Sequence, residues 1–268
     1  MKKQIIMSLL LIASPLYAQE SAPPAAPIKE VTAVIPSTGF PGLDRYRRQQ
    51  APIFSDDYGQ LARYRQQNAA LAQQPADNRV IFFGDSITDI WKLDRDFPGK
   101  HYVNRGIGGQ TTSQMLVRFR QDVLDLKPTV VVILAGTNDI AGNTGYISDS
   151  DIKENYMTLS ELAKLHHIQL VMASILPVHN YTDSSKELYA QRPTERINNL
   201  NHWLKHWSEA NGLIWLDYAS ALQDDAGKLS RQYSDDGVHP NENGFKVMAP
   251  LAEQAVNAAL QKQQQEKL

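Results

Sequence analysis

The residues of this chain that are best suited to chemistry lie in short polar blocks. One block is GDS at 84–86, in which a serine follows a glycine that tolerates a sharp turn. Another is DGVHP at 236–240, in which a carboxylate stands three residues before an imidazole. A serine hydroxyl becomes a nucleophile when a histidine removes its proton, and a carboxylate can hold that histidine in the required tautomer. Nucleophilic catalysis by serine is therefore one chemistry that these blocks permit.

Two further blocks lie between them and could supply hydrogen-bond donors. NRGIGGQTT at 104–112 places several glycines before a predicted helix, where free backbone N–H groups can face an anion or a developing oxyanion. GTND at 136–139 contains an asparagine whose amide can donate two hydrogen bonds. The glycines do not complete the dinucleotide pattern G-x-G-x-x-G, because position 111 is threonine, so phosphate binding is only weakly indicated.

Each block also has a purely structural interpretation. Ser86 could cap the next helix, and Asn138 could stabilise a turn through its own side chain. His239 could belong to a turn that leads into the last helix, with the following proline near the first helical position. Taken one at a time, the blocks leave these alternatives open.

Three other side chains have a less specific pattern. His202 and His206 lie four residues apart, a spacing found in metal sites. Position 203 is tryptophan, however, so the metal-binding motif H-E-x-x-H is not present. An ordinary helix face is therefore the better interpretation of this pair. Trp91 lies close after the first block and could either line a substrate pocket or fill the core.

Short apolar runs alternate with helical patterns along the chain. The runs predict strands at 80–83, 130–134, 168–173 and 213–216, with a weaker one at 101–103. Helical spacing predicts helices at 57–74, 112–126, 149–166, 194–210 and 241–261. This alternation predicts one α/β domain with helices on both faces of a parallel sheet. Ligands bind outside the carboxyl ends of such strands, which is where the polar blocks fall.

Composition excludes several classes of protein. The chain has 268 residues, 27 Lys and Arg against 29 Asp and Glu, and no cysteine. Without cysteine there is no disulfide framework, thiolate metal site or cysteine nucleophile. The formal charge of -2 argues against an electrostatic nucleic-acid binder.

The two ends differ in composition from the domain. Residues 1–18 have two lysines, a short apolar run and small residues, which predicts a cleaved signal peptide and an exported, periplasmic or secreted protein. Residues 19–56 contain six of the 14 prolines, which predicts an extended tether rather than a helix. We expect a single domain over 57–260 with a leading helix, no membrane span after cleavage, and a polar fraying tail at 261–268.

Together the four blocks resemble those of the SGNH/GDSL-type serine hydrolases. They occur in the order of that family, over roughly residues 75–260, and they supply the four residues for which the family is named: Ser86, Gly109, Asn138 and His239. The first block departs from GDSL only in having isoleucine at position 87. NRGIGGQTT and Trp91 are most similar to the platelet-activating-factor-acetylhydrolase-like branch.

The resemblance implies a fold, an activity and residue roles. It implies a three-layer, flavodoxin-like α/β/α sandwich around a mainly five-stranded parallel sheet. Ser86 would be the nucleophile and His239 the general base, oriented by Asp236. The backbone N–H groups of Ser86 and Gly109 and the Asn138 amide would form the oxyanion hole. Neither a cofactor nor a metal is implied, and the expected substrate is an ester of a small molecule or carbohydrate.

The finer function stays open at this point. We expect a secreted esterase that hydrolyses short acyl esters, acetyl above all, with O-acetylated carbohydrate as a candidate substrate. A lipase- or lysophospholipase-like acylhydrolase is one alternative, and a binding module without activity is another. A metal-dependent phosphoesterase would need ligands among Asp85, Asp89, Asn138, Asp139, Asp235 and His239. The polar segment 177–193 could line the substrate site or be a solvated connection.

Overall fold

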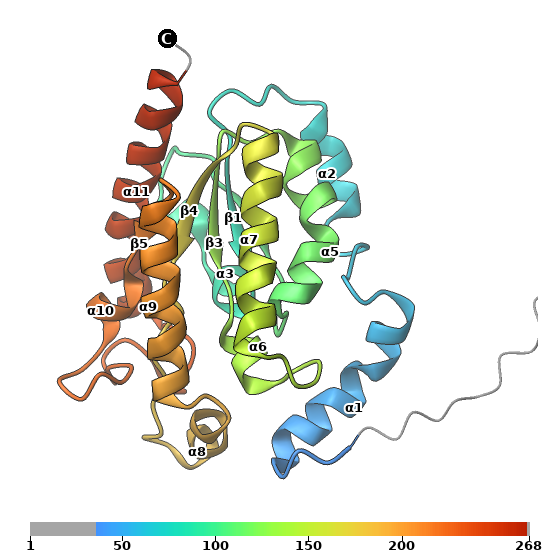
Figure 1. The fold of residues 1–268 in the computed structure, drawn as a ribbon, viewed down its shortest axis with the longest axis vertical. Coiled ribbons are helices and arrows are strands. Elements are labelled where there is room, and N and C mark those ends of the chain that lie inside the picture. The colour runs from blue at the N-terminus through green and yellow to red at the C-terminus, as the bar shows by residue number, and fades with distance from the viewer. Residues whose placement is uncertain (1–35, 267–268) are drawn as a thin grey trace, which may run out of the picture. The chain divides into compact units, whose positions relative to one another are not determined.

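Five parallel strands form the centre of the structure, a computed structural model that describes residues 36–266 (Figure 1). The strands are β1 (Val80–Gly84), β2 (Val103–Gly106), β3 (Val130–Leu134), β4 (Gln169–Ala173) and β5 (Ile214–Leu216). They pair in the order β2-β1-β3-β4-β5, and every pair is parallel. The predicted strands are confirmed, except that β2 begins two residues later and includes the first three residues of NRGIGG.

Helices cover both faces of this sheet. Those described are α1 (Pro41–Asp56), α2 (Arg65–Ala72), α3 (Ser86–Ile90), α4 (Leu93–Asp96), α5 (Thr112–Asp122), the 3-10 turn η1 (Leu124–Leu126), α6 (Thr137–Ala141), α7 (Asp149–Leu165), α8 (Asp183–Ala190), α9 (Thr194–Ala210), α10 (Tyr218–Leu222) and α11 (Glu242–Gln265). One face carries α5, α7 and α9, and the other carries α4, α10 and α11 (Figure 1). The three-layer α/β/α sandwich that the sequence predicts is confirmed.

Two apolar clusters, one on each face, hold the layers together. Side chains point alternately to the two faces of a strand, so Ile81 and Phe83 of β1 enter the cluster under α5 and α7. Phe82 enters the opposite cluster, where it meets the ring of Trp91. Since both faces of β1 and β3 are buried, these strands are continuous apolar runs rather than alternating ones. Trp91 is 3% exposed and fills the core.

The prediction of an extended tether is wrong for its described part, because α1 occupies residues 41–56. Pro41 takes the first helical position, where a missing N–H is not needed. Ten residues without proline follow it, and Pro52 interrupts only one hydrogen bond within the helix. The average composition of 19–56 concealed this local pattern. The expected signal peptide and residues 19–35 lie outside the described residues.

Two other boundaries differ from the prediction. The leading helix is only α2, because the Asp57 carboxylate accepts hydrogen bonds from the N–H groups of Leu61 and Ala62 and holds the chain in a turn. At the other end α11 continues to Gln265, so the described part of the tail is helical rather than frayed. Gln263 explains this extension, since it is 8% exposed and accepts a hydrogen bond from the Gln169 side chain.

The structure also describes the polar segment 177–193 and the lengths of the helices. The polar segment 177–193 contains the eight-residue helix α8, so it is not an irregular connection throughout. Within residues 36–266, no helix is both long enough and apolar enough to cross a membrane.

Candidate active site

The carboxyl end of the sheet brings a serine, a histidine and an aspartate into one hydrogen-bonded chain. Ser86 follows β1 directly and begins α3, and its Oγ lies 2.8 Å from Nε2 of His239. The other ring nitrogen of His239, Nδ1, lies 2.7 Å from a carboxylate oxygen of Asp236. Ser86 and His239, which are 153 positions apart in the sequence, therefore have the geometry of an activated nucleophile and its base.

The turn at 236–240 is shaped to hold this carboxylate. The second oxygen of Asp236 accepts from the backbone N–H groups of Val238 and His239, both at 2.8 Å. Gly237 has a φ of +83°, and a Cβ there would lie 2.3 Å from the carbonyl oxygen of His179. Only glycine fits this turn, so the spacing between carboxylate and imidazole is built into the backbone.

Asp236 stays ionised far into the acid range. Burial by itself would raise the pKa of Asp236, but hydrogen bonds from the ring and backbone N–H of His239 outweigh it and hold the pKa well below its usual value. An ionised carboxylate at Nδ1 keeps the proton on that nitrogen and leaves Nε2 free to accept the serine proton.

Gly109 and Asn138 lie beside Ser86 and complete the site. Both line the same cavity as Ser86 and His239. Gly109 has a φ of +76°, and its N–H has no acceptor among the described residues. A Cβ at Gly109 would lie 2.2 Å from the hydroxyl oxygen of Tyr46. The site thus brings together every residue that the sequence predicts, and its Gly109 N–H and Asn138 amide are donors of the kind that can stabilise an oxyanion.

Hydrogen bonds connect the first three blocks along the chain to one another. The Asp139 carboxylate accepts from the backbone N–H of Thr112 at 3.0 Å and from its hydroxyl, so GTND holds the start of α5. Asn104 donates to the carbonyl oxygens of Thr88 and Trp91. Burial raises the pKa values of Asp139 and Asp85 to about 6.

A fully buried arginine forms hydrogen bonds with two of the blocks. Arg118 of α5 donates to the carbonyl oxygen of Gly84 at 2.8 Å, to that of Arg105 at 2.9 Å, and to the side chain of Gln110. It also forms an ion pair with Asp122 at 2.9 Å, and both side chains are 0% exposed. The guanidinium therefore ties the ends of β1 and β2 to the loop that carries Gly109.

Two helices wall the catalytic cavity: α1, which the sequence did not assign to the site, and α8, which lies in the segment 177–193 that the sequence left open as a possible lining of the substrate site. The volume of the cavity is about 530 Å³. Tyr46 of α1 lies over Gly109, and Leu188 of α8 lines the same space. Arg192 and Asn143 also line the cavity, and both contact the side-chain oxygen of Asn138. None of these residues stands in a recognisable motif, and a wall formed by segments distant in sequence leaves no local pattern.

Several candidate ligands of the metal-dependent phosphoesterase have structural roles in the fold. Asp85 caps α3 by accepting from the N–H of Ile87, and the exposed Asp235 accepts from Asn241. His202 and His206 are exposed on α9 with their rings 4.4 Å apart. Within the described part of the chain, no group of three or more acidic or histidine side chains is arranged to hold a metal ion.

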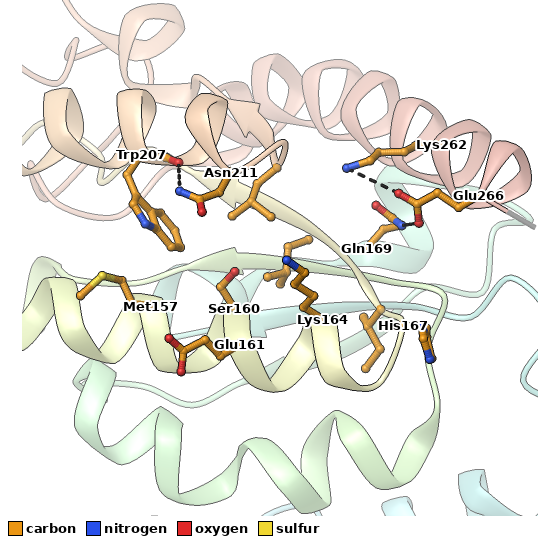
Figure 2. Close-up of a pocket in the computed structure, with 13 residues that line it drawn as sticks. Met157, Ser160, Glu161, Lys164, His167, Gln169, Trp207, Asn211, Lys262 and Glu266 are labelled. Carbon is orange, nitrogen blue, oxygen red and sulfur yellow. Dashed lines mark hydrogen bonds and ion pairs between the residues drawn. The ribbon is translucent and has the colours of Figure 1, made fainter.

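Figure 2 shows a second hollow, which lies at the opposite end of β4. Its walls come from α7, α9 and the end of α11, with Lys164, Trp207 and Glu266 among the lining residues. None of the four blocks reaches it. We therefore place the chemistry in the cavity beside Ser86.

Comparisons with known proteins agree with this arrangement. The family model described as GDSL-like lipase/acylhydrolase matches residues 82–247. A candidate acylhydrolase from Bacteroides fragilis has a similar structure, with a TM-score of 0.70 and 39% sequence identity; the alignment covers 76% of this chain and 99% of that one. An uncharacterized lipoprotein of Bacillus subtilis is 34% identical over 118 residues, 37% of this chain. The chain spans about half of that relative, 49% of its length.

Two more distant relatives have described activities. An acetylxylan esterase of Geobacillus stearothermophilus is 24% identical over 201 residues, which are 64% of this chain and 90% of the esterase. The alpha2 subunit of human platelet-activating factor acetylhydrolase IB is 38% identical over 65 residues, 22% of this chain and 28% of the subunit. The matches thus include the branch that the NRGIGGQTT block resembles.

Proposed function

Because the chain belongs to the GDSL-like lipase/acylhydrolase family, as its sequence predicts, we propose that it hydrolyses carboxylic esters through an acyl-enzyme on Ser86. The observation that carries this proposal is the hydrogen-bonded chain from the Ser86 hydroxyl through His239 to Asp236, beside the donors Gly109 and Asn138. Each group has a position that suits one step of acyl transfer.

In the first half of the reaction, Ser86 Oγ attacks the ester carbonyl while Nε2 of His239 takes its proton. The negative charge that forms on the carbonyl oxygen is stabilised by the N–H groups of Ser86, Gly109 and Asn138. His239 then gives the proton to the leaving alcohol. In the second half, water attacks the acyl-serine by the same route and releases the acid and Ser86.

We expect short acyl groups to be the preferred substrates. The cavity beside Ser86 has a mixed lining, in which apolar side chains (Leu43, Leu188, Val238) and Tyr46 lie beside polar ones such as Glu187 and Arg192. The similarity to an acetylxylan esterase supports an acetyl group, with O-acetylated carbohydrate as a candidate natural substrate. A lipase-like acylhydrolase would need room for a longer chain.

Rates on p-nitrophenyl acetate, butyrate and octanoate, beside release of acetate from acetylated xylan, test this proposal. A steep fall beyond acetyl is expected, and a rise with chain length would favour the lipase-like alternative. Ser86→Ala is expected to lower turnover by at least about 10⁴-fold without unfolding the protein. Wild-type turnover in this variant would reject the serine mechanism, and activity that a chelator abolishes would favour a metal enzyme.

Export of the protein is also a proposal, supported by residues 1–18 alone. Their lysines, apolar run and small residues are those of a cleaved signal peptide. Expression of the full chain in a bacterium, followed by N-terminal sequencing of the periplasmic fraction, is expected to give a chain that starts near residue 19. A full-length chain retained with the cells would contradict it.

A further inference from the structure

The orientation of the Asn138 amide is decided by three neighbours. Its Nδ2 donates to the backbone carbonyl oxygen of Gln110 at 3.0 Å. Its Oδ1 accepts from Nδ2 of Asn143 at 3.1 Å and lies 3.5 Å from Nη2 of Arg192, at the long end of a hydrogen bond. A backbone carbonyl can only accept and a guanidinium can only donate, so these two partners distinguish the ends of the amide.

The orientation matters because only one end of this amide can stabilise an oxyanion. Gln110 uses one N–H of Asn138, and the other remains for the cavity. If the amide were flipped, its carbonyl oxygen would meet the developing negative charge and repel it. The same flip would set an oxygen against the carbonyl of Gln110 and an NH2 against a cation.

Arg192 is buried, and no carboxylate among the described residues forms an ion pair with it. It follows α8, is 5% exposed, and lines the catalytic cavity. Its Nε donates to the Thr137 hydroxyl at 3.0 Å, and its Nη1 donates to the carbonyl oxygen of Leu188 at 3.1 Å. Burial lowers the pKa of Arg192 to about 10, so it stays charged at neutral pH. The carboxylates of Asp85 and Asp236 offset part of this effect by longer-range attraction. A buried cation without a direct ion pair is still unfavourable, and a role in packing alone does not require it.

We propose that Arg192 is a positioning residue that holds the carbonyl oxygen of Asn138, so that the free N–H of this amide stays aimed at the oxyanion of the substrate. Asn143 acts as the second donor, and its Nδ2 also donates to the carbonyl oxygen of Gly109 at 2.9 Å. Asn143 thus links both halves of the oxyanion hole. The inference rests on the proposed function, since it concerns the transition state of ester hydrolysis by Ser86.

A double-mutant cycle with Asn138 tests this inference. Arg192→Met is made in the wild-type chain and in Asn138→Ala, and kcat and KM are measured on p-nitrophenyl acetate. In the wild-type background we expect kcat to fall about 10- to 100-fold with KM within about threefold, because the lost interaction acts in the transition state. In the Asn138→Ala background the amide is already gone, so the same substitution should lower kcat by less than about threefold.

Arg196→Met is the matched control for losing an arginine near this site. Arg196 on α9 donates to the carbonyl oxygens of Ile140 and Ile147 and pairs with Asp149, and it contacts neither Asn138 nor the cavity. It should lower the melting temperature while leaving kcat within about twofold of wild type.

Two results would overturn the inference. One is a kcat for Arg192→Met within about threefold of wild type, and the other is an equal fall in both backgrounds. If Ser86→Ala and Asn138→Ala lose activity while Arg192→Met does not, only the positioning role fails. If Ser86→Ala keeps its activity, the proposed function itself fails.

Asn143→Asp keeps the inference testable if Arg192→Met does not fold. It has the same shape but replaces the donor with oxygens that repel both Oδ1 of Asn138 and the carbonyl of Gly109. We expect kcat to fall about 10- to 100-fold with KM nearly unchanged, and far less in the Asn138→Ala background. A kcat near that of wild type would contradict the positioning of Asn138 by its neighbours.

Discussion

The two sides of the catalytic cavity are held in opposite ways. The loops that carry Ser86, Gly109 and Asn138 are tied together by buried hydrogen bonds, and Arg118 beneath them is 0% exposed. The opposite wall is α1, in which Leu43 is the one buried residue.

Polar contacts fasten α1 to the rest of the domain. Gly42 and Leu43 donate their N–H groups to the Glu187 carboxylate at 2.8 and 3.1 Å. Arg47 donates to the carbonyl oxygen of Gly142 at 2.9 Å. The catalytic loops thus have a buried hydrogen-bond network and α1 does not. Reacting groups need a fixed geometry, and buried networks provide it. A wall that only limits the substrate can be held by a few contacts at the surface.

The largest effect that this comparison predicts lies in the catalytic turn. Asp236→Asn should lower kcat on the order of 10³–10⁴-fold, because the amide no longer holds His239 in the tautomer that accepts the serine proton. Asp235→Asn is the matched control, since Asp235 is exposed and contacts Asn241 only through a hydrogen bond at 3.2 Å. Steady-state rates on p-nitrophenyl acetate measure both, and similar rates in the two variants would contradict the role of Asp236.

Arg118→Met tests how strongly the buried network holds the catalytic side. Removing the guanidinium leaves Asp122 charged and unpaired and leaves buried carbonyl oxygens without donors, so we expect a loss of about 3–5 kcal/mol in the free energy of unfolding. Arg120→Met on the same helix is the control, because the Arg120 side chain is 66% exposed. Urea unfolding gives both values, and a loss below about 1 kcal/mol for Arg118→Met would show that the network is dispensable.

The two regions should also respond to pH in opposite directions. Burial raises the pKa of Asp85 to about 6 in the folded state, so its contribution to stability is full below about pH 4 and is lost as the pH rises through 6. Hydrogen bonds from Thr38 and Ser37 lower the pKa of Asp44 in α1 to about 2. Its contribution is present above about pH 4 and is lost as the pH falls through 2.

Asp85→Asn isolates the first of these contributions. Between pH 4 and pH 7 the wild type should lose roughly 3 kcal/mol more stability than the variant, since one pKa unit corresponds to about 1.4 kcal/mol. Urea unfolding at both pH values measures the difference. An identical decline in the two proteins would mean that folding does not raise the pKa of Asp85.

The smallest effect concerns the attachment of α1. Glu187→Ala removes the acceptor for the N–H groups of Gly42 and Leu43. We therefore expect α1 to move more easily away from the cavity, which would make room for longer acyl groups. We expect the ratio of octanoate to acetate hydrolysis to rise about 3- to 10-fold, which corresponds to about 1 kcal/mol, while the melting temperature changes little. Lys186→Ala, at an exposed position beside it, should leave the ratio unchanged. An unchanged ratio in Glu187→Ala would separate α1 from substrate selection.

Much of the fold and the centre of the site could be predicted from the sequence. Strands buried on both faces leave continuous apolar runs, and parallel strands place their carboxyl-end loops at one edge, so the four blocks had to meet there. Gly109 and Gly237 stand in motifs for a physical reason: their positive φ angles leave few alternatives to glycine at these positions. The α1 helix was missed because prolines dominate the composition around it, and because only one of its side chains is fully buried.

The sequence by itself determined which groups could react and which sheet edge would collect them, because motif order and strand periodicity are local properties. Only the tertiary structure decided how these groups are supported and enclosed. Arg118, Asn143 and Arg192 act through partners from other segments of the chain, and neither their burial nor their partners can be read from neighbouring residues. Short motifs specify the reacting groups of the site. Contacts between segments distant in the sequence fix the positions of these groups and shape the walls of the substrate cavity.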